Sequence, residues 1–194
     1  MSNIAFVLGN GTSRQSINLD HLNTYGKIYG CNALYREFSP DYLIAVDTKM
    51  ILEINKAGYQ HSHEVWTNRN KAFDKMNGFN FFTTSKGWSS GPTALHLASE
   101  HNNDVIYILG FDYTGIDNKV NNIYADTWNY KKSHEKATYH GNWLRQTLIT
   151  CQKFDKKRYI RVLGDDAFIP KEFQKLDNIS HISIEEFRKI FNIS

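Results

Sequence analysis

Short, wholly apolar runs recur along the chain, and each ends at a glycine or a polar residue. The runs at residues 4–8 (IAFVL), 42–46 (YLIAV) and 105–109 (VIYIL) show no alternation of apolar and polar positions. A strand that is apolar on both faces must be covered on both faces, which is typical of parallel sheets flanked by helices. This pattern constrains the fold more than any other feature of the sequence.

Helical patterns separate the apolar runs. Residues 48–57 have apolar positions at helical spacing and stop at Gly58, and residues 91–100 carry Pro92 in the first turn. The alternation predicts an α/β protein, a three-layer Rossmann-like domain with a mostly parallel sheet. We further expect strands at 27–31, 64–67 and 159–163, helices at 13–22, 143–154 and 184–191, and a loop with one helical turn at 68–88.

The length of 194 residues suits a single domain spanning residues 1–194, and no repeats interrupt it. Residues 114–139 form a long polar segment with few aliphatic residues but several aromatic ones. A segment of this length inside a domain is either functional or disordered, and its aromatic content argues against disorder. We interpret it as a loop or lid insertion that is mobile and closes over the site.

Charge and composition narrow the function classes. The net charge of +3 is mild, and no basic stripe interleaves with the aromatic residues, so nucleic-acid binding is disfavoured. No run is long enough to span a bilayer and no signal peptide precedes residue 4, so we expect a cytoplasmic protein, compatible with a homo-oligomer.

Cys31 and Cys151 are expected to be reduced, structural thiols. The basic residues near the C-terminus are interpreted as a solvated face: Lys156, Lys157, Arg158 and Arg161.

The first strand runs directly into Gly9-Asn10-Gly11-Thr12-Ser13. The functional interpretation is that backbone N–H groups of Gly11 to Ser13, with the two hydroxyls, hold a phosphate at a helix N-terminus. The alternative is a tight turn that binds nothing. The third glycine of a dinucleotide fingerprint and the Gly-Lys-Ser/Thr end of a P-loop are both missing, so the motif alone does not decide.

Polar residues also follow the other predicted strands. Asn32, Asp47 and Asp112 would meet at the carboxyl edge of a parallel sheet, where ligands bind. The first two are either helix caps or partners of a ribose and a base, and Asp112 is a base, a ribose binder or a loop-fixing acceptor. A second helix N-terminus is preceded by hydroxyl donors that could hold a second anion, at Ser89, Ser90 and Gly91.

The histidines and carboxylates give no recognised metal pattern, so no metal ligands are predicted. His140 stands at the end of the lid, directly before a helix. It is either a general base that reaches the pocket or simply the boundary of that helix.

The order of these motifs resembles a known group. "GNGTS" after the first strand, "CN" after the second, "SSGPTALHLA" before "VIYILGFDY", an Ile-Tyr-Ala-Asp loop and a histidine before a helix are similar to bacterial sialyltransferases that modify lipooligosaccharides. They also resemble Rossmann-like proteins of the archaeal 6-hydroxymethyl-dihydropterin diphosphokinase group. The resemblance runs from about Ile4 to Arg145.

The sialyltransferase resemblance implies a metal-independent transferase with a CMP-sugar donor and an acceptor hydroxyl. His140 would match the general base, and Tyr124 would match a tyrosine that assists the departing phosphate. The nucleotide would be held by Gly9, Asn10, Gly11, Ser13, Asn32, Asp47, Ser89, Ser90 and Gly91.

Two departures keep other functions open. Asp47 stands where those transferases have an amide, and Thr114 replaces an expected tyrosine next to Tyr113. The diphosphokinase relatives would instead use Asp47 and Asp112 with Mg²⁺. We therefore expect a nucleotide-dependent transferase, most simply a glycosyltransferase without a cofactor, with a magnesium-dependent diphosphokinase or a non-catalytic nucleotide-binding protein as alternatives.

Overall fold

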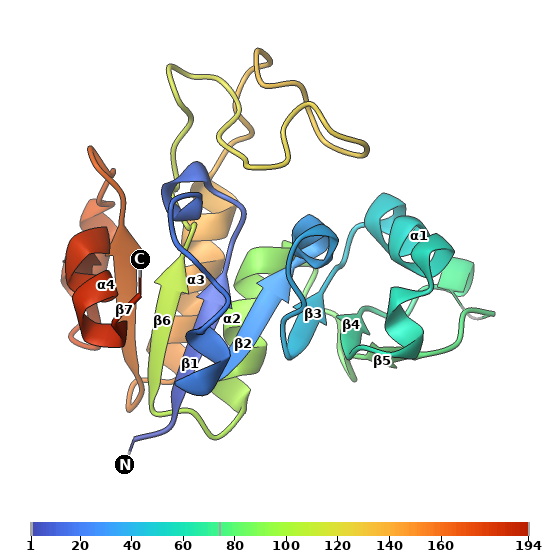
Figure 1. Ribbon diagram of the computed structural model, residues 1–194, viewed down its shortest axis with the longest axis horizontal. Coiled ribbons are helices and arrows are strands. Elements are labelled where there is room, and N and C mark those ends of the chain that lie inside the picture. The colour runs from blue at the N-terminus through green and yellow to red at the C-terminus, as the bar shows by residue number, and fades with distance from the viewer. Residues whose placement is uncertain (1, 74, 194) are drawn as a thin grey trace.

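In a computed structural model, which describes residues 2–73 and 75–193, eight parallel strands form one sheet with helices against it (Figure 1). The strand order is β5-β4-β3-β2-β1-β6-β7-β8, so the chain extends the sheet on one side of β1 and then on the other. The predicted α/β fold with a parallel sheet is confirmed. The strands are β1 (Ile4–Leu8), β2 (Lys27–Cys31), β3 (Tyr42–Ile44), β4 (Val65–Thr67), β5 (Phe79–Phe81), β6 (Val105–Leu109), β7 (Arg158–Leu163) and β8 (Ile179–Ser183).

Four α-helices occur in the described residues, together with short 3₁₀ turns. The α-helices are α1 (Thr48–Ala57), α2 (Ser90–Glu100), α3 (Gly141–Lys153) and α4 (Ile184–Phe191). The 3₁₀ turns are η1 (Thr12–Arg14), η2 (Leu22–Thr24), η3 (Asn32–Arg36), η4 (Tyr59–His61), η5 (Lys71–Phe73) and η6 (Lys171–Lys175).

Alternate residues of the central strand serve two separate cores. Phe6 and Leu8 of β1 belong to the cluster that includes α1 and α4, whereas Ala5 and Val7 belong to the cluster that includes α2 and α3. Both faces of β1 are therefore buried, which explains why its sequence lacks a polar alternation. The result is the three-layer arrangement in which helices cover both sides of the sheet.

Local sequence fixes where the helices begin and end. Helix α1 ends at Gly58, whose φ of 69° allows its N–H to close onto the carbonyls of Ile54 and Asn55. Helix α4 begins at Ser183, whose hydroxyl accepts the N–H of Glu186 at 3.1 Å. These ends match the predicted boundaries of both helices.

The helix expected at residues 13–22 is wrong. The chain forms only the η1 turn, then a separate η2 turn at Leu22. Two interactions favour this irregular path: Arg14 folds back to donate to the carbonyl of Gly9, and the Asn18 side chain accepts the N–H of Asp20. Such local side-chain bonds to the backbone compete with helix formation.

The two outermost strands were not predicted. β5 falls inside the segment expected to be a loop, and β8 was not expected at all. Each lies at one end of the sheet, paired with a neighbour on one side only. Edge strands keep polar residues, such as Asn80 in β5 and Ser180 in β8, so the apolar run that marks the inner strands is missing.

Cys31 and Cys151 are buried and are not disulfide-bonded, as expected. A search of the described helices finds none with the length and hydropathy needed to cross a membrane.

Gly11 is predicted to be required for packing rather than for backbone freedom. Its φ is −65°, but a Cβ there would lie 2.4 Å from Oδ2 of Asp112 and 2.8 Å from the carbonyl oxygen of Gly110. We expect Gly11→Ala to lower the free energy of unfolding by about 1–3 kcal/mol in chemical denaturation.

Gly91→Ala is the matched control for that substitution. Its Cβ would meet nothing closer than Cζ of Phe111 at 3.4 Å, which is an ordinary contact. Its unfolding free energy should stay within about 1 kcal/mol of the parent value. Equal losses in both variants would contradict the packing account of Gly11.

Candidate functional site

A pocket of about 580 Å³ opens at the carboxyl edge of the sheet. It lies where the strand order reverses, because β2 and β6 flank β1 on opposite sides, and ligands of open parallel sheets bind at such points. We call it the strand-end pocket. Of the residues predicted from the sequence, it gathers Gly9, Asn10, Gly11, Asn32, Asp47, Ser89, Ser90, Gly91 and Asp112.

The glycine turn after β1 has few free donors. The N–H of Gly11 donates to the carbonyl of Gly110 at 2.9 Å, and the N–H of Thr12 donates to Oδ1 of Asn121 at 2.9 Å. The N–H and the hydroxyl of Ser13 both bind the carboxylate of Asp112. Thr12 and Ser13 thus bind other parts of the protein and do not line the pocket, and the predicted phosphate donors of this turn are occupied in this structure.

The open donors are at the start of α2. The N–H of Ser89 donates to Oε1 of Gln146 at 3.1 Å, whereas the N–H groups of Ser90 and Gly91 have no acceptor among the described residues. Ser90 Oγ accepts the N–H of Val46 at 3.1 Å, which ties α2 to the end of β3. The α2 N-terminus therefore presents two free N–H groups and the positive end of an eleven-residue helix to the pocket.

Two asparagine side chains in the pocket wall have acceptors without partners. Asn10, only 9% exposed, donates through Nδ2 at 3.4 Å to the carbonyl of Cys31 and to the hydroxyl of Tyr130, but its Oδ1 is unpaired. Oδ1 of Asn32 is likewise buried and unpaired. Buried oxygens are almost always hydrogen-bonded, and both of these are shielded from solvent, so each becomes available to a hydroxyl or an amine of a ligand only when the wall around it opens.

Asp47 follows β3 and contributes a carboxylate to the pocket rim. Its surface is open to the pocket, but surrounding protein displaces part of its water and raises the pKa of the carboxyl above its ordinary value. Although it precedes α1, its side chain does not cap that helix. The carboxylate is therefore available to accept from a ligand hydroxyl or amine.

Two buried guanidinium groups lie behind the pocket. Arg161 is 2% exposed, and it donates to the carbonyls of Phe111 at 2.8 Å and Phe168 at 2.9 Å, with no carboxylate ion pair in the part of the chain described. Arg14 is 3% exposed and donates to the carbonyl of Gly9 at 2.6 Å. Arg161 was expected on a solvated face, and that expectation is wrong for this residue. Its backbone partners at the end of β6 hold it inside, and burial lowers its pKa while the guanidinium stays charged.

Tyr124 lies outside the pocket lining. Its hydroxyl donates to Oε1 of Glu37 at 2.5 Å and accepts from Nη2 of Arg14 at 3.2 Å. Burial raises the pKa of this phenol, and the adjacent Glu37 carboxylate reinforces the effect. The predicted leaving-group tyrosine is thus the lid residue that is held against Arg14 and Glu37 in this structure.

His140 is adjacent to the pocket without lining it. It is the residue before α3, and its ring lies 6.2 Å from that of Phe168 and 6.0 Å from that of Tyr139, centre to centre. Thr138 and Trp143, on either side of it in the chain, both line the pocket. The imidazole is therefore next to the pocket lining along the chain but is not part of it in this structure.

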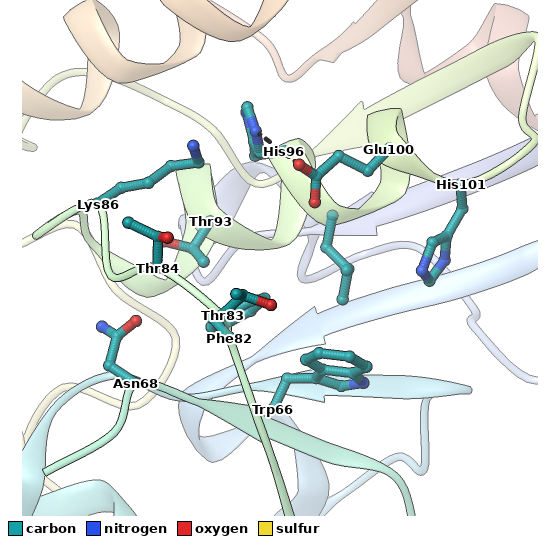
Figure 2. Close-up of a pocket in the computed structure, with 11 residues that line it drawn as sticks. Trp66, Asn68, Phe82, Thr83, Thr84, Lys86, Thr93, His96, Glu100 and His101 are labelled. Carbon is teal, nitrogen blue, oxygen red and sulfur yellow. Dashed lines mark ion pairs between the residues drawn. The ribbon is translucent and has the colours of Figure 1, made fainter.

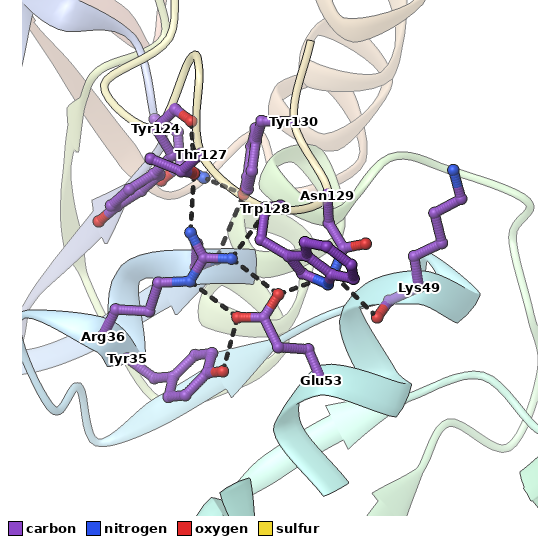
Figure 3. Close-up of polar contacts among 11 residues, drawn as sticks. Tyr35, Arg36, Lys49, Glu53, Tyr124, Thr127, Trp128, Asn129 and Tyr130 are labelled. Carbon is purple, nitrogen blue, oxygen red and sulfur yellow. Dashed lines mark hydrogen bonds and ion pairs between the residues drawn. The ribbon is translucent and has the colours of Figure 1, made fainter. Parts of the chain in front are cut away.

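The lid segment, residues 114–139, lies above the carboxyl ends of β1 and β6 (Figure 1). It has two isolated bridges and no regular strand or helix in the described structure. Figure 3 shows how its tip is held: Arg36 donates to Oγ1 of Thr127 at 2.8 Å and to the carbonyl of Trp128 at 2.9 Å. Glu53 of α1 binds Arg36 through both oxygens at 2.7 Å and accepts from Asn129 at 2.7 Å. The mobility of the lid stays a prediction, and this cluster is what would have to break for it to move.

Several residues of the site were not predicted from the sequence. Trp88 and Trp143 line the pocket, and Asn121 of the lid binds the β1 turn. Arg14 and Arg161 lie behind the strand-end pocket. The two tryptophans flank predicted site residues and could have been found from that position; the other three depend on contacts between distant segments.

No group of three histidine, cysteine or acidic residues close enough to hold a metal ion occurs within residues 2–73 and 75–193. Comparison of the chain with protein-family models, curated proteins and solved structures found no match.

Glu53→Gln is predicted to release the lid tip. Burial alone would raise the pKa of this carboxyl, but hydrogen bonds from Arg36, Tyr35 and Asn129 together lower it. At pH values above the ordinary glutamate pKa, the interaction therefore stabilises the docked lid. This stabilisation is lost as the pH falls through the lowered pKa of Glu53. At neutral pH the variant should show several-fold faster hydrogen exchange in residues 125–131, with a loss of about 1 kcal/mol or less in global stability.

Glu186→Gln, at an exposed position on α4, is the control. It should leave exchange in the lid unchanged. If Glu53→Gln also leaves lid exchange unchanged, the Arg36–Glu53 cluster does not hold the lid.

Proposed function

We propose that the strand-end pocket binds the nucleotide of a CMP-sugar donor and that the protein is a metal-independent glycosyltransferase. The observation that carries the proposal is the pair of free N–H groups of Ser90 and Gly91 at the N-terminus of α2, in the lining of a pocket whose walls also hold the unpaired oxygens of Asn10 and Asn32. Free N–H groups and a positive helix end favour a phosphate. Unpaired oxygens favour hydroxyl and amine donors, which the same nucleotide carries on its ribose and base.

The two kinds of groups come from different elements of the fold, which supports one orientation of the nucleotide. The phosphate would lie at the start of α2, next to Ser90 and Gly91. The ribose and base would lie toward Asn10, Asn32 and Asp47, the residues after β1, β2 and β3. Trp88 and Trp143 supply aromatic surface in the same pocket.

The proposed reaction uses His140 as general base. The imidazole takes the proton of an acceptor hydroxyl, the acceptor oxygen bonds to the anomeric carbon, and the bond from that carbon to the phosphate oxygen breaks. The charge on the departing CMP is stabilised by the α2 N-terminus and by the buried Arg161 behind the pocket. Tyr124 would have to leave Glu37 to assist the phosphate, so we assign it a role only when the lid moves.

The carboxylates favour this proposal over a magnesium-dependent diphosphokinase. Both oxygens of Asp112 already accept from Ser13, one from the N–H and one from the hydroxyl. Of the two acids that the diphosphokinase interpretation needs, only Asp47 has a carboxylate that is not engaged. Mg²⁺ is bound through carboxylate oxygens, and one free acid gives it little to bind.

The test is release of CMP from CMP-N-acetylneuraminate by the purified protein, with chelator and with Mg²⁺. We expect release in chelator, with water or a saccharide as acceptor, and about 10²- to 10⁴-fold slower release in His140→Ala with CMP binding retained. His134→Ala, an exposed position in the lid, is the control and should keep the parent rate.

Two outcomes would overturn the proposal. Turnover of ATP only with Mg²⁺, lost in Asp47→Asn, would assign the diphosphokinase reaction instead. Tight CMP binding without any CMP release would assign a non-catalytic nucleotide-binding protein.

A further inference from the structure

A second cavity, of about 420 Å³, lies beside α2 (Figure 2). It is bounded by α2, by the end of β4 and by the chain after β5. We call it the Trp66 pocket. Residues that line it include Trp66, Asn68, Phe82, Thr84, Lys86 and Glu100.

One wall of the Trp66 pocket is aromatic. The rings of Trp66 and Phe82 lie 5.2 Å apart, centre to centre, at an angle of 38°. Nε1 of Trp66 donates to Oε1 of Glu64 at 2.8 Å, which fixes the indole in place. An oriented indole offers a flat apolar surface to a ring-shaped ligand.

The opposite side of the pocket carries polar groups that have no hydrogen bond within the described chain. These are the hydroxyls of Thr83 and Thr84, the amide of Asn68 and the ammonium of Lys86. Figure 2 shows Thr84 and Lys86 on the chain after β5 and Asn68 directly after β4. Neutral donors and acceptors around an aromatic wall fit a hydroxyl-rich ring, and the ammonium of Lys86, 5.5 Å from the centre of the Trp88 ring, can pair with one carboxylate.

The α2 wall keeps the charge of the pocket low. His96 is 3% exposed, and burial lowers the pKa of its imidazole to about 4, an effect that nearby Lys86 reinforces and Glu100 opposes. At neutral pH the ring is therefore uncharged. Its Nε2 lies 3.3 Å from Oε1 of Glu100 and its Nδ1 lies 3.2 Å from Oγ1 of Thr150, so it orients the carboxylate rather than adding a cation. Among the described residues that line the pocket, Lys86 is the only lysine or arginine, and Lys153 beside them is already 4.0 Å from Oε1 of Glu100, so a polyanion such as a triphosphate is poorly matched.

The two pockets are separated by one short segment. Lys86 lines the Trp66 pocket, and the next two residues, Gly87 and Trp88, line the strand-end pocket. Gly87 has a φ of 64°, and a Cβ at this position would meet nothing within 4 Å. The segment is thus a low, open boundary over which an extended ligand can pass.

We propose that the Trp66 pocket binds a saccharide, and that this saccharide is the acceptor of glycosyl transfer. Its ring packs on Trp66, its hydroxyls bond to Asn68, Thr83 and Thr84, and a carboxylate on the sugar pairs with Lys86. Its far end crosses Gly87 and brings a hydroxyl to the donor. The acceptor role rests on the proposed function, whereas saccharide binding does not.

The experiment follows the four tryptophan indole N–H resonances in ¹⁵N spectra of the intact protein. Lactose and 3′-sialyllactose are the probes, the second carrying one carboxylate. We expect both to shift the Trp66 resonance in a saturable manner. Trp66→Phe identifies that resonance, and Trp66→Ala should weaken binding about tenfold.

Two further variants separate the pockets. Lys86→Met should weaken 3′-sialyllactose and leave lactose unchanged, and its exposed position makes a folding defect unexpected. Trp143→Phe, in the strand-end pocket, should keep saccharide affinity. CMP should shift the Trp143 resonance and leave Trp66 unmoved.

Failure of each proposal gives a different result. If neither saccharide shifts Trp66, or if they shift Trp143 alone and compete with CMP, the saccharide site is wrong whether or not CMP binds. If the saccharides shift Trp66 but CMP shifts no tryptophan, saccharide binding stands and the proposed transferase does not.

Discussion

The structure depends on the close approach of two turns, one after β1 and one after β6. The N–H of Gly9 donates to the carbonyl of Leu109 at 2.8 Å, and the N–H of Gly11 donates to Gly110. A Cβ on Gly9 would lie 2.5 Å from the carbonyl oxygen of Gly110, so only glycine allows the turns to meet. This contact joins the ends of β1 and β6 at the point where the strand order reverses. Its glycines are part of the lining of the strand-end pocket. The glycines of the first turn are thus explained by packing before any ligand is considered.

The same contact decides which groups remain open to a ligand. Asp112 accepts hydrogen bonds from Ser13, and Asn121 accepts from Thr12. The hydrogen-bond donors of the turn after β1 are therefore already paired within the protein. The free N–H groups lie instead at the start of α2, in a helix long enough to carry a dipole. Arg161, buried without a carboxylate ion pair among the described residues, adds positive potential behind them. An anion is therefore expected at the start of α2 rather than at the glycine turn after β1.

The sequence predicted which residues meet at the carboxyl edge of the sheet, but not which of their groups are already hydrogen-bonded within the protein. Asn32, Asp47 and Asp112 could be placed at one edge because the carboxyl ends of parallel strands meet there, whatever the details of packing. The engagement of Thr12 could not be predicted, because its partner Asn121 is 109 residues away and lies in an irregular segment. Arg161 sits among basic residues that resemble a solvated face, and only the pairing of β6 with β7 brings it under the pocket. The edge strands β5 and β8 were not predicted from the sequence for a related reason, because a half-exposed strand needs no continuous apolar run.

The central claim is that a nucleotide phosphate binds at the N-terminus of α2. The most direct test is a titration of ¹⁵N-labelled protein with CMP in the presence of chelator, following the backbone amide resonances. The account predicts the largest shifts at Ser90 and Gly91, and their loss in Gly91→Ala, which keeps its fold but places a methyl group at this helix end. CMP binding that leaves both amides unmoved and perturbs Gly11 to Ser13 instead would contradict the account. So would binding that appears only with Mg²⁺.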